Sequence, residues 1–297
     1  MQQVYNTGEY KILVDRGMQH ELSPNDYKLI IDYTVEKDLK PFKEEVLNHL
    51  YEYHKLNDMP LLFSGGMDST FLLRSLVELG IKPKIITMSF SKNNDDYDCV
   101  RAKNLCQQYG VSQPEFIYYK RDAVFKHVNE LIYDRGIAYP MIHGFYMSYM
   151  LKLFPQTQFL CGFGSEFKLV DDNIIMPSRP LLVKLDNPGV LFDFTSSRTF
   201  LSYLNHEQFY TNYKKILKLP LIERPDAYYV RNLIYQNCYP DIDIEEKKLP
   251  EDRYISEDFY HQINPLIQQK FLLINTPSFL FNIEDYLKRN PKENNDC

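Results

Sequence analysis

The sequence has 297 residues, of which 44% are hydrophobic, and a formal net charge of -6. This length allows one large domain or one domain with an appendage, and the composition is that of a folded protein rather than a disordered one. The negative charge excludes a global basic field for nucleic acid, although a local patch could still bind RNA.

The five cysteines are scattered and form no C-x-x-C pair, so the sequence supports neither a zinc knuckle nor a redox dithiol. We expect buried, reduced thiols. Residues 1–4 do not resemble a signal or transit peptide, and no apolar run approaches the ~20 residues of a membrane span. These features predict a cytoplasmic protein with no membrane partner.

Strand-like runs at 10–14 and 27–33, with a Pro-Asn-Asp turn signal between them, predict a small N-terminal β-hairpin extension over residues 1–37. A helix is then predicted over 39–54 from the spacing of its apolar residues. A polar break at 57–60 leads into a short apolar strand at 61–63.

From residue 61 onward, strand and helix patterns alternate. This alternation predicts an α/β fold, an open parallel sheet with helices on both faces, over residues 38–197. The expected strands are 61–63, 84–90, 115–119 and 157–161, and the expected helices are 71–79, about 98–109 with Asp98 as its cap, 123–134 and 141–153.

The region 198–297 is predicted to be mostly helical and packed on the same domain. Short strands are expected just before it, at 181–183 and 190–192, and a mobile, acidic, proline-flanked loop within it, at 240–252. The expected helices are 198–219, 228–236 and 256–274.

The most informative stretch is Ser-Gly-Gly-Met-Asp-Ser-Thr at 64–70, between an apolar strand and a helix. A glycine turn before a helix N-terminus is suited to bind an anion, since free N–H groups and the helix dipole both favour negative charge there. Asp68 could hold a divalent cation that bridges phosphate oxygens. An ordinary strand turn followed by an Asp-capped helix is the alternative interpretation.

The 64–70 motif resembles the S-G-G-x-D-[ST] loop of the PP-loop ATP pyrophosphatases, which split ATP into AMP and pyrophosphate. A second stretch, Cys-Gly-Phe-Gly-Ser-Glu-Phe at 161–167, resembles the S-G-x-G-[SA]-D-E motif of asparagine synthetase and β-lactam synthetase. The resemblance covers about residues 38–170 and implies an adenine nucleotide alpha hydrolase-like fold. As a dinucleotide-binding fingerprint, Gly162-x-Gly164 is weak, because Phe167 stands where the third glycine belongs.

The resemblance implies that ATP binds as its Mg²⁺ complex. It assigns the metal to Asp68 and Glu166, and pyrophosphate departure to a nearby lysine. Residues expected to bind the nucleotide are Leu62, Ser64, Gly65, Gly66, Asp68, Ser69, Thr70, Met88, Cys161 and Gly162, and the candidate catalytic residues are Asp68, Lys92, Lys247 and Lys248. Each of these lysines could instead be a solvated surface charge.

The sequence departs from the family pattern at two positions. Glu166 replaces an aspartate, and Phe163 replaces a glutamate or tyrosine that handles the amine proton. The glutaminase domain of asparagine synthetases, with its N-terminal cysteine, is also missing, so we expect that ammonia from glutamine is not made on this chain.

Three functions follow as hypotheses. The first is a ligase that adenylates a small-molecule carboxylate and lets an amine or ammonia displace AMP, with a separate glutaminase as an optional partner. The second uses the same ATP chemistry on a nucleobase of tRNA or DNA. The third is a nucleotide-binding sensor or partner subunit without turnover, which Phe163 and Glu166 keep open.

Overall fold

The structure is a computed structural model, and only part of the chain is described below. The described stretches longer than three residues are 3–6, 11–15, 18–22, 27–31, 37–56, 59–89, 91–120, 159–162, 173–177, 196–220, 228–243 and 278–281. The shorter ones are 122–123, 126, 150, 153–154, 157, 168–170, 190–191 and 223.

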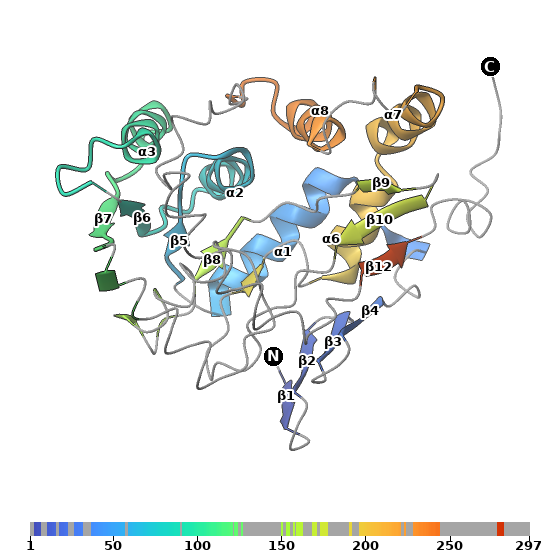
Figure 1. The fold of residues 1–297 in the computed structure, drawn as a ribbon, viewed down its shortest axis with the longest axis horizontal. Helices are drawn as coiled ribbons and strands as arrows, with labels where there is room; N and C mark the ends of the chain where they lie inside the picture. The colour runs from blue at the N-terminus through green and yellow to red at the C-terminus, as the bar shows by residue number, and fades with distance from the viewer. Residues whose placement is uncertain are drawn as a thin grey trace.

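A five-stranded parallel sheet forms the centre of the fold (Figure 1), so the predicted α/β class is confirmed. Its strand order is β11-β8-β5-β6-β7, and each neighbouring pair is parallel. The strands are β5 (Leu61–Leu62), β6 (Ile85–Ser89), β7 (Glu115–Tyr118), β8 (Leu160–Cys161) and β11 (Val190–Leu191).

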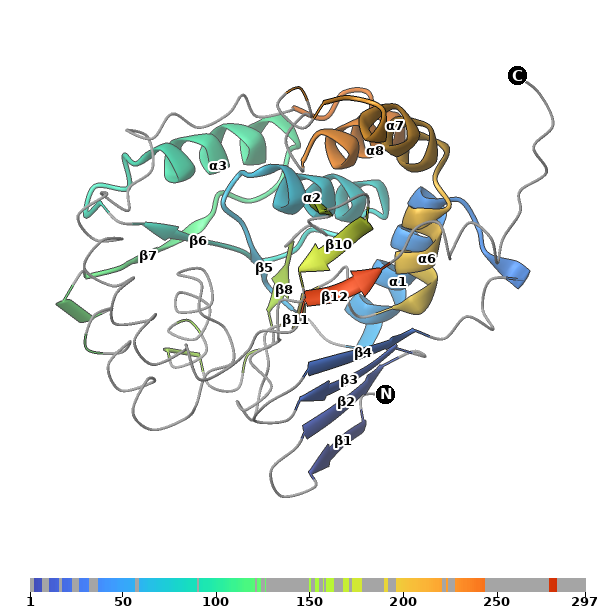
Figure 2. The same ribbon diagram turned by 45° about the vertical axis from the view of Figure 1, so that its right-hand side comes forward.

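The helices α2 (Met67–Glu78) and α3 (Tyr97–Gln108) lie side by side on one face of this sheet (Figure 2). Helix α2 connects β5 to β6, and α3 connects β6 to β7, so both connections move across the sheet in the same direction. Because such crossovers are right-handed, both helices lie on the same face of the sheet. The cap of α3 is Asp96, whose side chain accepts a hydrogen bond from the Cys99 N–H. The prediction of Asp98 as the cap was therefore wrong by two residues.

The chain reverses its direction across the sheet after β7. Strands β6 and β7 lie on one side of β5, whereas β8 and β11 lie on the other. The helices predicted at 123–134 and 141–153, between β7 and β8, fall almost entirely outside the described residues. The gap between β5 and β8 is therefore the point at which the strand order changes direction.

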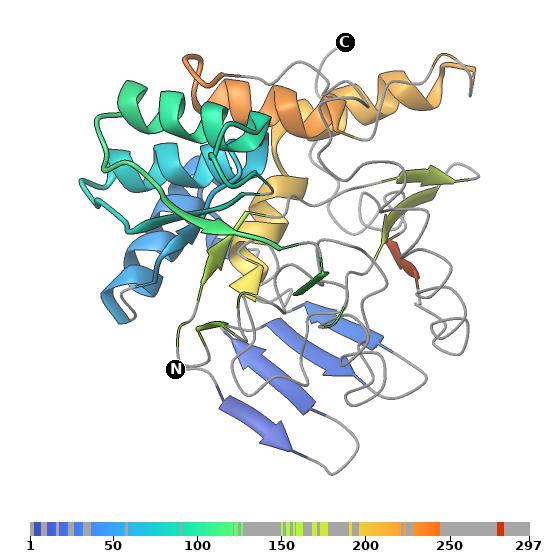
Figure 3. The same cartoon turned by 60° about the vertical axis from the view of Figure 1, so that its left-hand side comes forward.

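The N-terminal extension is larger than the predicted hairpin. Its four antiparallel strands are β1 (Gln3–Asn6), β2 (Lys11–Asp15), β3 (Met18–Leu22) and β4 (Tyr27–Ile31), paired in sequence order. Figure 3 shows them as a separate layer below the helices. The two runs predicted to pair, β2 and β4, are separated by β3, because Met-Gln-His-Glu-Leu is polar enough to read as a loop yet alternates as a strand does.

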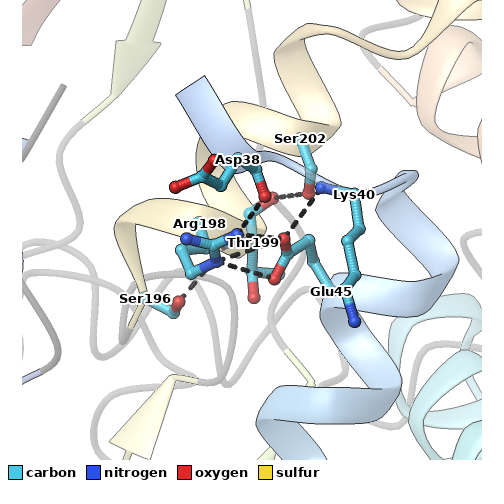
Figure 4. Close-up of polar contacts among 7 residues, drawn as sticks. All are labelled: Asp38, Lys40, Glu45, Ser196, Arg198, Thr199 and Ser202. Atoms are coloured by element: carbon cyan, nitrogen blue, oxygen red, sulfur yellow. Dashed lines mark hydrogen bonds and ion pairs between the residues drawn. The ribbon is translucent and has the colours of Figure 1, made fainter. Parts of the chain in front are cut away.

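Helix α1 (Phe42–Leu56) packs against α2 and against α6 (Ser197–Leu204). An ion pair between the half-exposed Arg198 and the buried Glu45 links α6 to α1 (Figure 4). The Arg198 guanidinium donates to both carboxylate oxygens of Glu45, with Nε 3.1 Å from each, and also to the backbone carbonyl of Asp38. Glu45 is 4% exposed and also accepts from the Lys40 N–H at 2.9 Å. These contacts fix where the chain enters α1.

The single helix predicted at 198–219 is two helices, α6 and α7 (Glu207–Leu217). Asn205 ends the first, and the His206 side chain accepts from the Gln208 N–H to cap the second. The polar Asn-His pair thus supplies a stop and a start that helical periodicity does not register.

Helix α8 (Tyr229–Cys238) follows close to the predicted bounds and lies beside α2 (Figure 1). A second, three-stranded antiparallel sheet has the order β12-β10-β9, with β9 (Lys168–Val170), β10 (Asn173–Pro177) and β12 (Ser278–Phe281). The predicted strand at 190–192 is confirmed as β11, whereas the predictions for 181–183 and 256–274 lie outside the described residues.

The described core is apolar and strongly aromatic. Phe71 of α2 stacks on Tyr235 of α8 with ring centroids 4.0 Å apart, and Phe42 of α1 stacks on Phe71 at 5.8 Å. Four cysteines (Cys99, Cys106, Cys161 and Cys238) are buried and free, as expected, and burial raises the pKa of each thiol.

Candidate functional site

The glycine loop (residues 63–66) joins β5 to α2 and leaves the start of α2 without a side-chain cap. Gly66 is the N-cap, and within the described part of the chain no side chain caps the first turn. The first N–H groups of an α-helix have no partner inside the helix. Asp96 caps the next helix along the same sheet, α3, so the missing cap distinguishes α2 from its neighbour.

Gly65 sets the shape of the glycine loop. Its φ of +72° lies in the left-handed region, and an added Cβ would stand 2.9 Å from Cγ of Arg101. Arg101, on α3, donates from Nε to the Gly65 carbonyl at 2.7 Å, and Thr70 donates to the same carbonyl at 3.2 Å. The loop is therefore held from two helices.

The second predicted motif meets the first across the sheet. β8 pairs with β5 so that Cys161 is opposite Leu62. The next residue, Gly162, packs so closely on α2 that an added Cβ would lie 2.7 Å from the backbone carbon of Asp68 and 2.7 Å from the backbone nitrogen of Ser69. Two stretches about a hundred residues apart thus meet at the start of α2.

This meeting point lies where open α/β sheets bind their ligands. In such sheets the ligand binds beyond the carboxyl ends of the strands, at the place where the strand order reverses. Here that place is the gap between β5 and β8. Both predicted motifs follow the strands that flank this gap.

The predicted hydroxyl donors have different roles in the structure. Ser69 and Thr70 are buried, and their hydroxyls donate to the carbonyls of Gly66 and Gly65 at 3.0 and 3.2 Å. They therefore stabilise the glycine loop. Ser64 is exposed, and its Oγ accepts from the Gly66 N–H at 3.3 Å, so its own O–H remains available to donate.

Asp68, the second residue of α2, contacts α8. Its Oδ2 accepts from Nη1 of Arg231 at 2.9 Å, and its Oδ1 accepts from the Tyr235 hydroxyl at 3.2 Å. Burial by itself lowers the pKa of Arg231, but the Asp68 carboxylate and nearby tyrosines raise it by more. The pKa therefore lies above its ordinary value, and the guanidinium stays charged.

The remaining predicted residues fall into three groups. Leu62 and Met88 are half-buried near the ends of β5 and β6, and Cys161 is buried at the end of β8. Lys92 is exposed in the turn after β6. Glu166, Lys247 and Lys248 lie outside the described residues.

Sequence reasoning missed Arg231, Tyr235 and Arg101. None belongs to a recognisable motif. Arg231 and Tyr235 reach the site from α8, far along the chain, and Arg101 reaches it from α3, the next helix after α2. A signal existed for Arg231, which stands in a predicted helix between Val230 and Ile234 as a charge on an otherwise apolar face. A charge in such a position is buried only when it has a partner.

The described residues fit the phosphate chain of a nucleotide better than they define a complete metal site. The first turn of α2 has no side-chain cap, Ser64 just before it is exposed, and the Arg231 guanidinium is paired with Asp68 in that turn. No group of three or more His, Cys, Asp and Glu side chains gathers for a metal among the residues described. Each oxygen of Asp68 accepts one hydrogen bond, and a carboxylate has about four lone-pair sites, so Asp68 retains capacity for Mg²⁺.

The fold is that of an α/β protein with a glycine loop at the reversal point of its parallel sheet. No protein-family model matches the chain, and no curated protein matches it. Over the described residues, none of the helices combines the length and the apolar character needed to cross a bilayer.

Proposed function

We propose that this protein is an ATP-dependent ligase that cleaves ATP to AMP and pyrophosphate, in the manner of the asparagine-synthetase-like PP-loop enzymes. The observation that carries the proposal is the convergence of the 64–70 motif and the Cys161-Gly162 dipeptide at the gap between β5 and β8. The resemblance of both motifs to one enzyme family, together with their contact in the fold, favours this chemistry over an ordinary capped helix.

The nucleotide's β- and γ-phosphates lie against the first turn of α2 in this proposal, where the N–H groups and the helix dipole stabilise them. A carboxylate oxygen of the acid substrate attacks the α-phosphorus, the bond from that phosphorus to the bridging oxygen breaks, and pyrophosphate leaves. The nitrogen of an amine or ammonia then attacks the acyl carbon, loses a proton and displaces AMP.

Positioning and charge neutralisation supply most of the catalysis in such a reaction. Asp68 would hold Mg²⁺, which would supply positive charge to the departing pyrophosphate. The residues of the chain orient the phosphate chain, because the glycine loop is fixed by bonds from Arg101 and Thr70. A small carboxylic acid, an amine or ammonia as nitrogen source and a cytoplasmic location complete the proposal, with a separate glutaminase as an optional supplier.

The test is product analysis with α-labelled ATP and Mg²⁺, with amino acids, ammonium or RNA added in separate arms. We expect AMP and pyrophosphate. Asp68→Ala should abolish them, and Ser64→Ala, at an exposed position, should lower the rate roughly 10-fold by removing one donor. Asp98→Ala is the matched control, since Asp98 is the second residue of α3 as Asp68 is of α2.

The products decide between the hypotheses. ADP and phosphate would contradict the proposal, and stimulation by RNA alone would replace the small-molecule acid with a nucleobase.

A second function, nucleotide binding without turnover, is favoured by one observation. Both oxygens of Asp68 are already engaged, by Arg231 and Tyr235. This function predicts ATP binding by calorimetry and no AMP in any arm.

A further inference from the structure

Arg231 is a buried charge with an incomplete set of partners. The residue is 7% exposed on α8 and lies over the Tyr228 ring, with its guanidinium carbon 4.4 Å from the ring centroid. Nη1 is paired with Asp68, but Nε is buried and has no hydrogen-bond partner among the described residues. Buried donors in native proteins nearly always have partners, so an unmet Nε–H on a charged group requires an explanation.

The guanidinium reaches the start of α2. Asp68 is the second residue of that helix, and side chains there lean toward the helix N-terminus, over the open N–H groups. Through Asp68, the Arg231 guanidinium is held within reach of the same first turn that binds phosphate in the proposed function.

The surrounding contacts fix this arrangement. Tyr235 donates to the second oxygen of Asp68, and its ring stacks on Phe71 with centroids 4.0 Å apart and planes 9° apart. The carboxylate is thus held between two groups of α8. A planar guanidinium held in this way is preorganised to bind two phosphate oxygens at once.

We propose that Arg231 is a direct ligand of the nucleotide's pyrophosphate portion, with Asp68 and Tyr235 holding its guanidinium in position. This inference rests on the proposed function and deepens it. It places the cation that supports pyrophosphate departure on α8, a role for which the sequence offers Lys92, Lys247 and Lys248 as candidates. Lys92 is exposed, whereas Arg231 is buried beside the motif.

The experiment measures binding of inorganic pyrophosphate, and separately of Mg²⁺ with ATP, by calorimetry. We expect Arg231→Lys, which keeps a charge for Asp68, and Arg231→Gln to bind pyrophosphate between about 10-fold and 100-fold more weakly than the unaltered protein. Thermal unfolding of each variant checks that it folds.

Arg74→Lys and Arg74→Gln are the matched controls. Arg74 is also an arginine beside α8 that pairs with an aspartate, Asp241 at 3.3 Å, and lies over a tyrosine, Tyr239 at 4.9 Å. It stands six residues further along α2, about 9 Å from Asp68 along the helix axis. These controls should bind pyrophosphate as the unaltered protein does.

A measurement on the unaltered protein covers the case in which the Arg231 variants do not fold. The arginine Nε–Hε signal of Arg231 should shift in the NMR spectrum when pyrophosphate is added, since that donor gains an acceptor. Binding with unchanged affinity in folded Arg231 variants, or no shift of this signal in a protein that binds pyrophosphate, would overturn the inference alone. Absence of any binding of pyrophosphate or ATP would overturn the proposed function as well.

Discussion

Replacing Gly162 by alanine would place a methyl group in the contact that joins the two motifs. The new Cβ would lie 2.7 Å from the Asp68 carbonyl carbon, 2.7 Å from the Ser69 nitrogen and 2.8 Å from the Asp68 oxygen. All three are backbone atoms of the first turn of α2, so no flexible side chain can move aside. Ordinary contact begins near 3.4 Å, and β8 and α2 must therefore separate by about 0.7 Å.

Overpacking of this kind typically costs about 1–3 kcal/mol, and a rigid backbone contact should fall near about 3 kcal/mol. With about 2.1 cal/mol/K of unfolding entropy per residue, that corresponds to roughly 5 °C in Tm for 297 residues. The assay is urea unfolding followed by circular dichroism, with a thermal scan alongside. Pyrophosphate binding should weaken in the same variant, because the displaced turn carries the open N–H groups.

Gly80→Ala and Gly110→Ala separate the steric effect from the conformational one. Both glycines have φ in the left-handed region, +72° and +64°, yet a Cβ at either would meet nothing within 4 Å. Each should cost only the left-handed penalty of about 1–2 kcal/mol. A Gly162→Ala variant that is more stable than these controls would refute the claim that β8 and α2 are in closest contact at this residue.

Three further predictions concern the scaffold around the site. Arg198→Ala removes the cation from the buried Glu45 carboxylate, which keeps only the hydrogen bond from the Lys40 N–H. The free energy of unfolding, measured by urea titration, should fall by about 2–3 kcal/mol. Adding Glu45→Gln to this variant should recover part of that loss. Asp96→Ala should cost about 2 kcal/mol because the cap of α3 is lost, and an Asp98→Ala cost as large would show that the cap is misassigned. Burial raises the pKa of Cys106 from 9.0 to about 12, so the unfolded chain releases the thiol proton at lower pH than the folded one. The stability contributed by the protonated thiol is therefore complete below about pH 9. It is lost as the pH rises to 12, by about 1 kcal/mol per pH unit. Cys106→Ala should reduce that alkaline slope, and equal slopes in denaturation curves at several pH values would contradict it.

The sequence by itself determined the class of the fold and the place of its central loop. Short apolar runs predict the strands, and segments with a 3.6-residue apolar period predict the helices between them. The turn from β5 to α2 needs a positive φ, which Gly65 supplies. These features depend on residues close together in the chain, which is why they could be predicted. The division of the 198–219 helix at Asn205-His206 is also local, but it depends on capping and not on the apolar periodicity that predicts the helix.

Only the tertiary structure decided which residues complete the site. The contact of Gly162 with α2 depends on β8 pairing beside β5 rather than beside β7 at the sheet edge. The partner of Asp68 is Arg231, 163 residues later, and it arrives because the aromatic faces of α2 and α8 stack. A charged side chain is buried only where another segment of the chain neutralises it. The residues around Asp68 in the sequence do not indicate which segment that is.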